Sequence, residues 1–435
     1  MASDDDRAWE TLRALPLGQR VELTDATGRR WEGTVIPPNE FSGKRVLTLK
    51  LESGYNVGVT IGPGVRYEIV GAPPPAGSAR PAAVPPAAGD AGAVVLLTTG
   101  GTIASRVDYE TGGVRPVNEP SEILDFYPEL RQAGPVRIVP VFDKMSEDIA
   151  PADWLALATD VAAAFRSGAP GVVIAHGTDT LGFTAAALAF LLRDLPGPVV
   201  LVGAQRSPDR PSSDGPSNLA AAVAVARDPR LAEVVVVMHE GLSDTRFAIH
   251  AGPRVRKMHS SRRDAFASRN GPPLGRFEDG RIAWLGVPRP RAPGPAVVDG
   301  PIDPRAALVW SYPGLTAEAV ARHTAGARGV ILAGTGLGHV PSGLLPWVRS
   351  ATAAGTVVAM TTQCLEGNAD PYVYATGRDL LRAGTVYLHD LLPETAYAKL
   401  VWALGHAPDR DGVVRLLLED RAGEFSARHP PDGGA

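Results

Sequence analysis

The feature that most constrains this chain is a series of short apolar runs, from residue 93 onward, that alternate with alanine- and leucine-rich stretches. Each run is continuous rather than alternating, which is typical of strands buried on both faces. Strands that alternate with helices predict a parallel sheet covered on both sides, a doubly wound α/β fold. The runs are AVVLLTT (93–99), PGVVIAHGT (170–178), GPVVLVGAQ (197–205), AEVVVVMH (232–239), AALVWSYPG (306–314), RGVILAGTG (328–336) and GTVVAMTTQ (355–363). The clearest helical stretches between them are 151–168 and 180–195.

Changes of composition divide the chain into four parts. The N-terminal part has short alternating segments around Gly-containing turns, which predict a compact β domain. A segment of almost only Pro, Ala and Gly follows; it cannot build a core and is expected to be an extended linker. A proline-rich stretch, 286–305, separates two α/β parts. The predicted parts are a small all-β, barrel-like domain (1–71), a linker (72–92) and two α/β domains (93–290 and 305–435).

The charge balance and the cysteine content exclude several classes of protein. The net charge is −4, from 43 basic and 47 acidic residues, which argues against a general nucleic-acid or membrane surface. The single cysteine, Cys364, cannot form a disulfide framework or a cysteine-based metal site. The N-terminus lacks the pattern of a secretory signal, and no apolar run approaches the roughly 20 residues of a membrane span. A soluble, cytoplasmic protein is expected.

Two of the apolar runs end in threonine-containing turns. In TTGGTIAS, Gly100 and Gly101 allow the backbone to approach a ligand closely, and Thr102 follows just beyond the strand. In HGTDTLGFTA, Thr178 and Asp179 stand at the start of a helix, where backbone N–H groups favour an oxyanion. A threonine hydroxyl becomes a nucleophile only when a base removes its proton. Both turns also fit the simpler interpretation of helix caps, and His176 is expected to be a structural hydrogen-bonding group.

Lys257 is a candidate for that base. It lies in RVRKMHSSRR among four arginines, in a chain with only five lysines. Lysine can lose its proton in a suitable environment, whereas arginine effectively cannot. A buried lysine near Thr178 would suit a hydroxyl nucleophile, and a solvated basic loop is the alternative interpretation. A further polar cluster, Ser146 and Glu147 in MSED, fits either a substrate-binding role or a capping role before the helix at PADW.

These motifs together resemble the L-asparaginase/glutaminase family. The resemblance rests on TTGGTIAS, HGTDTLGFTA, GAQRSPDRPSSDGPSNL and KMHSSRRDAFAS, and covers about residues 93 to 410. The N-terminal β segments, with ILAGTGLGHVP, TTQCLEGNADPYVYATGRDLLRAGTV and LLPETAYAKLVWALG, are similar to one branch of that family. This branch is formed by the D subunits of archaeal-type glutamyl-tRNA(Gln) amidotransferases. The resemblance implies two doubly wound domains of the asparaginase type after the small β domain.

The resemblance also implies roles for individual residues. Thr102 corresponds to the threonine that forms the acyl-enzyme, Thr178 and Asp179 to the second threonine and its carboxylate, and Lys257 to their lysine partner. Ser146 and Glu147 align with a substrate-holding pair, although SED stands where the branch usually has SEN. Tyr109 is the one candidate for a tyrosine that family enzymes carry on the loop after TGGTI, and its spacing differs from that of asparaginases.

The expected activity is release of ammonia from glutamine or asparagine. The resemblance implies a homodimer that assembles with two copies of a partner, the E subunit, which binds ATP and Mg²⁺ and holds most of the tRNA. No cofactor is expected in this chain itself. A free-standing L-asparaginase that has acquired a β domain is the main alternative, and a binding module on an inactive amidase scaffold is a third.

Overall fold

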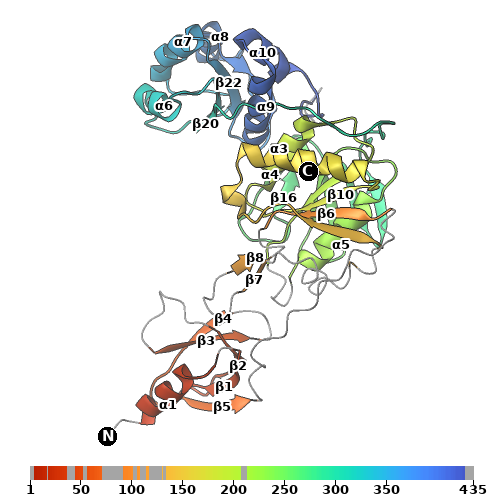
Figure 1. Cartoon of the computed structure of the whole chain (residues 1–435). Coiled ribbons are helices and arrows are strands. Elements are labelled where there is room, and N and C mark those ends of the chain that lie inside the picture. The colour runs from red at the N-terminus through yellow and green to blue at the C-terminus, as the bar shows by residue number, and fades with distance from the viewer. Residues whose placement is uncertain are drawn as a thin grey trace.

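The computed structural model shows a small β unit followed by two α/β domains (Figure 1). It describes residues 4–16, 18–36, 45–51, 56–70, 92–100, 105–107, 114–116, 130, 134–206 and 213–426. The predicted linker lies almost entirely outside these residues. Among the described residues, every helix is too short or too polar to span a lipid bilayer.

The N-terminal unit is an antiparallel sheet with one helix, coloured red to orange in Figure 1. The strands lie in the order β4-β3-β2-β1-β5, and no pairing of the two edge strands closes the sheet within the described residues. The predicted turn between the first two strands forms: the Gly28 N–H donates to the Asp25 carbonyl at 3.0 Å. The elements are α1 (Asp4–Arg13), β1 (Arg20–Thr24), β2 (Arg30–Val35), β3 (Val46–Leu51), β4 (Asn56–Thr60) and β5 (Arg66–Val70).

This unit has a core of its own. Alternate residues of its strands, such as Val21 and Leu23 in β1, are fully buried, as the period of two in the sequence predicts. Helix α1 is an addition that the sequence analysis missed, because the acidic start of the chain hid its apolar side. Leu12 of α1 is fully buried against the sheet, and Trp9 packs beside it.

The first α/β domain is built on a mixed sheet of the order β18-β17-β14-β13-β12-β10-β6-β9. Strands β9, β6, β10, β12 and β13 are parallel, and β6, β10, β12 and β13 carry the continuous apolar runs that the sequence predicts. Strand β9 has the mixed sequence VRIVP and was not among those runs. The parallel strands are β6 (Val94–Thr98), β9 (Val136–Pro140), β10 (Val172–Ala175), β12 (Val199–Val202) and β13 (Val234–His239).

The same sheet continues through three antiparallel strands that the sequence analysis did not separate from the parallel pattern. Only residues 240–245 connect β13 to β14, which is too short for the crossover that a parallel strand needs. The antiparallel strands are β14 (Arg246–Ala251), β17 (Gly275–Glu278) and β18 (Arg281–Trp284).

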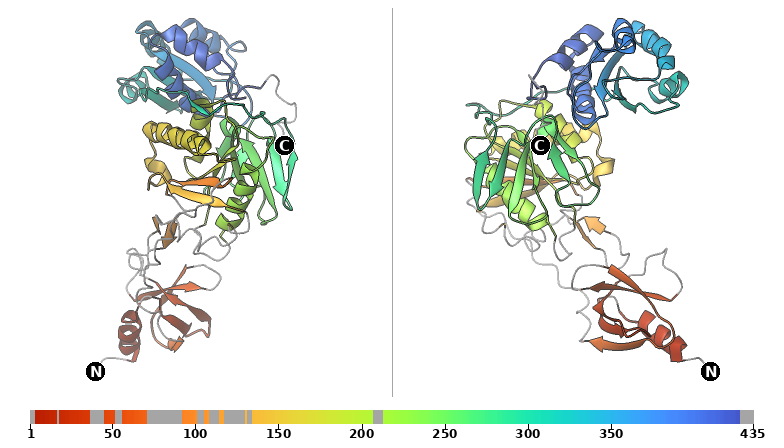
Figure 2. Two further views of the ribbon diagram at one scale, coloured as in Figure 1. Left: turned by 45° about the vertical axis from the view of Figure 1, so that its right-hand side comes forward. Right: turned by 180° about the vertical axis from the view of Figure 1, so that it is seen from behind.

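Helices cover the parallel strands on both faces, and two of them lie where the sequence predicts helices (Figure 2). The helices of this domain are α3 (Pro151–Arg166), α4 (Leu181–Leu191) and α5 (Gly215–Ala226), with 3-10 turns η3 (Ser146–Asp148) and η4 (Gly252–Arg254). Three small ribbons complete it: β7 (Ser105–Val107) with β8 (Val114–Pro116), β15 (Val255–Lys257) with β16 (Phe266–Ser268), and β11 (Leu192–Arg193) with β19 (Val297–Val298).

The C-terminal domain repeats the architecture at smaller size, with the parallel order β20-β21-β22-β23. Its strands are β20 (Ala306–Trp310), β21 (Gly329–Gly334), β22 (Val357–Thr362) and β23 (Val386–Tyr387). Its helices are α6 (Ala317–His323), α7 (Leu345–Ala353), α8 (Ala375–Arg382), α9 (Pro393–His406) and α10 (Arg410–Leu418), with the 3-10 turn η5 (Ser342–Leu344). All seven apolar runs of the sequence therefore form the expected strands, which confirms the predicted fold class.

The two α/β domains share one hydrophobic core across their junction. Helix α9 packs on helix α4, and the ring of Trp402 stacks on that of Phe190 with centroids 6.2 Å apart (Figures 1 and 2). Both rings are almost completely buried. This shared core fixes the C-terminal domain against the helix that begins at the HGTDT turn.

Candidate active site

Thr178 and Asp179 follow the middle one of three neighbouring parallel strands, at the carboxyl edge of the sheet. Strand β10 pairs in parallel with both β6 and β12, and Ala175 lies opposite Thr98 on one side and Val202 on the other. The segments that follow these strands therefore leave the sheet side by side. In open α/β sheets this edge is where ligands bind.

Lys257 meets the HGTDT turn although it lies 79 residues away from Thr178. Its Nζ donates to Thr178 Oγ1 at 2.8 Å and to Asp179 Oδ1 at 2.7 Å. The Lys257 side chain is 15% exposed, whereas the Asp179 side chain is 67% exposed. The ribbon of β15 and β16 brings the lysine over the start of α4, where the Val255 carbonyl lies only 3.2 Å from the position of a Cβ at Gly182. The structure thus joins a hydroxyl, an amine and a carboxylate in one cluster.

Helix capping does not account for this turn. Thr180 is the residue before α4, yet its side chain makes no capping hydrogen bond. Its hydroxyl donates instead to the Ser146 carbonyl at 2.6 Å. Asp179, which precedes Thr180 and could also cap the helix, pairs with Lys257 instead. Thr180 is therefore the N-cap of α4 by position, and neither described side chain caps the helix with a hydrogen bond.

Ser146 and Glu147 lie in the 3-10 turn η3, directly beside the HGTDT turn. Ser146 is 3% exposed, and a Cβ at Gly177 would lie 2.7 Å from the Ser146 Cβ, so that only glycine allows this approach. Glu147 is exposed, and its Oε2 lies 3.5 Å from Ser146 Oγ. The capping role before α3 belongs to Asp153, which accepts a hydrogen bond from the Ala150 N–H at 2.8 Å.

Gly100 has a different role from the one predicted. Its φ of +90° favours glycine, and a Cβ there would lie 2.6 Å from the carbonyl oxygen of Lys144. The space that Gly100 leaves is therefore filled by the neighbouring backbone and not kept for a ligand. Thr102, Gly101 and Tyr109 lie outside the described residues, so their predicted roles remain predictions.

Two residues for which the sequence suggests no role, Gly203 and Asp214, help to place Thr178 and the neighbouring loop. A Cβ at Gly203 would lie 2.6 Å from Thr178 Cγ2, so glycine at this position makes room for the threonine. The fully buried Asp214 carboxylate accepts hydrogen bonds from the Gln205 and Arg206 N–H groups at 2.9–3.1 Å and thereby fixes the loop after β12. Both residues stand in GAQRSPDRPSSDGPSNL, a motif that the resemblance includes but to which no role was assigned.

His176 is a structural hydrogen-bonding group, as predicted. It is fully buried, its Nδ1 lies 2.6 Å from the Gly177 carbonyl, and burial lowers its pKa to about 4. Within the described residues, no three side chains of His, Cys, Asp or Glu come together in a way that would hold a metal ion.

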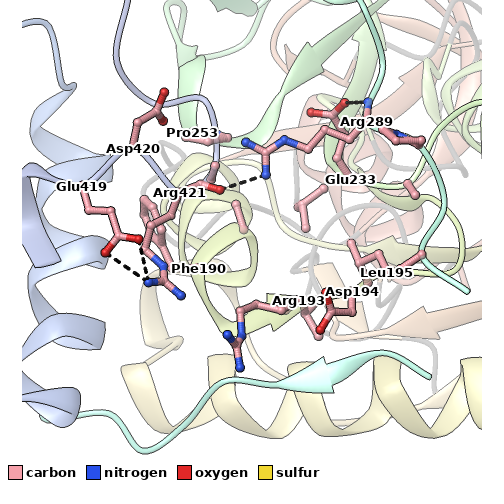
Figure 3. Close-up of a pocket in the computed structure, with 17 residues that line it drawn as sticks. Phe190, Arg193, Asp194, Leu195, Glu233, Pro253, Arg289, Glu419, Asp420 and Arg421 are labelled. Carbon is pink, nitrogen blue, oxygen red and sulfur yellow. Dashed lines mark hydrogen bonds and ion pairs between the residues drawn. The ribbon is translucent and has the colours of Figure 1, made fainter. Parts of the chain in front are cut away.

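A cavity of about 480 Å³ lies elsewhere, where the inter-domain segment meets the C-terminal segment (Figure 3). None of the predicted site residues lines it. Two of its charged side chains bond to its own walls: Arg289 donates to the Arg421 carbonyl at 2.9 Å, and Glu233 accepts from the Arg289 N–H at 2.9 Å. The cavity therefore lies between the inter-domain segment and the C-terminal segment, and it is separate from the cluster around Lys257.

The two α/β domains and the threonine, aspartate and lysine cluster define a chain of the asparaginase/glutaminase class. The sequence matches the asparaginase N-terminal family over residues 93–289, and the glutaminase/asparaginase C-terminal domain over 305–417. The L-asparaginase of Thermococcus kodakarensis has a similar structure, with a TM-score of 0.70 and 33% identity over 77% of this chain and 99% of that one. L-asparaginase I of Vibrio cholerae is also similar, with a TM-score of 0.66 and 29% identity over the same shares.

The N-terminal unit shows to which branch of the asparaginase/glutaminase class the chain belongs. Residues 15–70 match the GatD N-terminal domain. The D subunit of the glutamyl-tRNA(Gln) amidotransferase of Pyrococcus horikoshii is 44% identical over 399 residues, which are 91% of each chain. The same subunit of Saccharolobus islandicus is 42% identical over 432 residues, 98% of this chain and 97% of that one. The chain belongs to the family of glutamyl-tRNA(Gln) amidotransferase D subunits.

Proposed function

We propose that this chain is the ammonia-producing amidohydrolase subunit of a glutamyl-tRNA(Gln) amidotransferase, with glutamine or asparagine as the amide donor. The observation that carries the proposal is the contact of Lys257 with Thr178 and Asp179 at 2.8 and 2.7 Å. An amine in contact with a hydroxyl is the arrangement that moves a proton during amide cleavage. The match to the D subunit family over nearly the whole chain supports the same conclusion.

The reaction proceeds through an ester. The Thr102 hydroxyl attacks the side-chain amide carbon of the substrate, and the carbon–nitrogen bond breaks as an acyl-threonine forms. The threonine proton leaves with the amide nitrogen as ammonia, and water then hydrolyses the ester to free the acid and restore the hydroxyl. Thr178, Lys257 and Asp179 carry the protons, and backbone N–H groups at the strand ends stabilise the oxyanion.

The charges around the cluster suit an amino-acid substrate. Asp179 is largely exposed beside Lys257, and Glu147 is exposed on the adjacent turn. Two carboxylates at the mouth of a site attract the α-ammonium group of glutamine or asparagine. Ser146, buried next to Gly177, stands on the same turn as Glu147 and supplies a hydroxyl for the substrate.

Two different polypeptides carry out the two half-reactions of the amidotransferase: this chain releases ammonia, and a partner uses it on the tRNA. A chain with a net charge of −4 is a poor electrostatic match for tRNA, so the tRNA is held mainly by a partner, the E subunit. That partner binds ATP and Mg²⁺, activates the glutamyl group on the tRNA in the cytoplasm and receives the ammonia. The complex contains two copies of each polypeptide.

The two copies of this chain form a homodimer through their α/β domains. Exposed aromatic side chains at the end of β20 and in the loops after β20 and β22 support such a contact, among them Trp310 at 38%, Tyr312 at 52% and Tyr374 at 56% exposure. The Arg256 guanidinium lies 5.5 Å above the Trp310 ring and is the neighbour of Lys257 in sequence. A second copy that covers these aromatic residues would therefore lie close to the site.

A free-standing L-asparaginase is the second candidate, because solved asparaginases share the two α/β domains. These structures cover 77% of this chain, and the N-terminal unit matches the GatD domain, which favours the amidotransferase. Ammonia release by the full chain from asparagine and glutamine, with and without the E subunit and Glu-tRNA, separates the two. Stimulation of glutamine turnover by the complex supports the proposal, whereas rapid unstimulated asparagine turnover supports the alternative.

Substitution of Thr102 and Lys257 tests the mechanism. We expect Thr102→Ala and Lys257→Met to lower kcat about a thousandfold or more, because each removes a group needed for covalent or proton-transfer catalysis. Lys50→Met, in the N-terminal β unit, is the matched lysine control and should leave the rate unchanged. Near-wild-type turnover by either site variant would remove that residue from the mechanism.

A further inference from the structure

A buried row of hydrogen bonds runs from helix α3 to the turn that carries Thr178. Trp154 Nε1 lies 3.2 Å from Thr184 Oγ1, which lies 2.9 Å from His176 Nε2. His176 Nδ1 lies 2.6 Å from the carbonyl oxygen of Gly177. Three elements contribute, namely α3, α4 and the end of β10, so the row ties the covering helices to the strand end.

The chemistry of the groups fixes the direction of every bond in this row. An indole N–H only donates, so Thr184 Oγ1 accepts from Trp154. A carbonyl only accepts, so His176 Nδ1 carries a hydrogen and donates to Gly177. The remaining nitrogen, Nε2, then accepts from the Thr184 hydroxyl. No bond can be reversed while the imidazole is neutral, so the histidine is held in one tautomer.

Burial keeps that ring neutral. Trp154, His176 and Thr184 are 4%, 0% and 0% exposed. Burial lowers the pKa of His176 to about 4, which leaves the imidazole uncharged at neutral pH. The Tyr397 ring, from helix α9 of the C-terminal domain, packs on Trp154 in a T-shaped arrangement with centroids 6.2 Å apart. The row is therefore enclosed by both α/β domains.

The row determines where one backbone N–H points. In a trans peptide the C=O and the following N–H are antiparallel. The Gly177 carbonyl is turned toward the buried histidine, so the Thr178 N–H is directed away from it. Within the described part of the chain, that N–H donates to no protein acceptor. The same residue presents its hydroxyl to Lys257.

We propose that Trp154, Thr184 and His176 form a hydrogen-bond relay that aims the Thr178 N–H at the oxyanion of the tetrahedral intermediate. His176 is a positioning residue in this scheme: it touches the Gly177 carbonyl and no reacting atom. The relay explains why the HGTDT turn keeps a buried histidine next to its glycine. For its kinetic consequences, this inference rests on the proposed amidohydrolase function.

Kinetics of the full chain with glutamine or asparagine test the relay. A donor to an oxyanion acts only in the transition state, so its misalignment lowers kcat and leaves KM unchanged. We expect about a 100-fold loss of kcat in His176→Leu and about a tenfold loss in Thr184→Val. Thr324→Val is the matched control, because Thr324 at the end of α6 is also buried, and among the described residues its hydroxyl donates to the Val320 carbonyl of that helix alone.

A conservative variant separates positioning from folding. His176→Asn keeps an N–H donor near the Gly177 carbonyl, so its kcat should lie well above that of His176→Leu. The tautomer is a second, independent readout: ¹⁵N NMR should show a neutral His176 ring with hydrogen on Nδ1, and Thr184→Val should weaken that preference. The signal is assigned as the one missing from His176→Asn.

The outcomes are distinct. Equal kcat values for Thr184→Val and Thr324→Val, or a His176 ring with hydrogen on Nε2, would overturn the relay. A wild-type chain that releases no ammonia under any condition would contradict the proposed function. The NMR measurement of the His176 tautomer would still test the direction of the hydrogen bonds in the row.

Discussion

Two buried histidines predict that the first α/β domain loses stability as the pH falls below about 6.5. Burial lowers the pKa of His176 to about 4 and that of His250 to about 3, from 6.5 in the unfolded chain. The nearby charge of Arg269 adds to the effect at His250. Between pH 6.5 and each lowered pKa, the histidine binds more protons in the unfolded chain than in the folded one. The free energy of unfolding therefore falls as the pH falls.

The size of this loss of stability depends only on the histidine pKa in the unfolded chain over most of this pH range. A pH of 5 lies about 1.5 units below the pKa of a histidine in the unfolded chain. At about 1.36 kcal/mol per unit, each histidine therefore lowers the free energy of unfolding by about 2 kcal/mol. The pair together predicts a loss of about 4 kcal/mol between pH 7 and pH 5. Carboxylates with lowered pKa values, such as Asp228 and Asp303, contribute mainly below that window. Glu233, whose pKa burial raises, acts in the opposite direction.

Urea unfolding at pH 7 and pH 5, followed by tryptophan fluorescence, measures the effect. The variant His250→Asn keeps a polar group near Ser268 Oγ, which lies 2.8 Å from His250 Nδ1, and removes the titrating ring. We expect its loss of stability between the two pH values to be about half that of the wild type. An equal loss in variant and wild type would refute the reasoning.

Two further substitutions follow from close contacts. Gly203→Ala places a methyl group where Thr178 Cγ2 lies 2.6 Å away, so we expect kcat to fall about 100-fold in an ammonia-release assay. Gly241→Ala, with no atom within 4 Å of its added Cβ, should leave kcat unchanged, and an equal loss in both would contradict the prediction. Glu424→Gln breaks the fully buried ion pair with Lys399 and should lower the free energy of unfolding by about 3 kcal/mol. An unchanged urea midpoint would show that this pair contributes little.

Seven strands of the two α/β domains could be predicted from the sequence because each is a continuous apolar run. The antiparallel extension could not, since β14, β17 and β18 carry mixed polar and apolar residues and follow from loop length instead. Helix α1 was missed because its three leading aspartates hide the apolar side that Leu12 buries. Apolar pattern therefore predicts buried elements well and half-exposed edges poorly.

The residues of the candidate site could likewise be predicted from the sequence only in part. The scarcity of lysine and the threonine turns led to Lys257 and Thr178, whose side chains lie in contact. The supporting groups could not be found, because Trp154 and Thr184 stand on helices whose composition indicates only a core. Gly100 was misinterpreted for a related reason: the sequence reveals that something approaches a glycine, but not that it is the backbone of Lys144.

The most direct test of the central claim, that Lys257 and Thr178 act as one unit in amide cleavage, is a double-mutant cycle. Ammonia release from glutamine is measured for Lys257→Met, Thr178→Val and the combined variant, since groups that act together lose their effect together. The account predicts that the double variant is no slower than the slower single variant. Losses that multiply would show that the 2.8 Å contact between Nζ and Oγ1 has no part in the reaction.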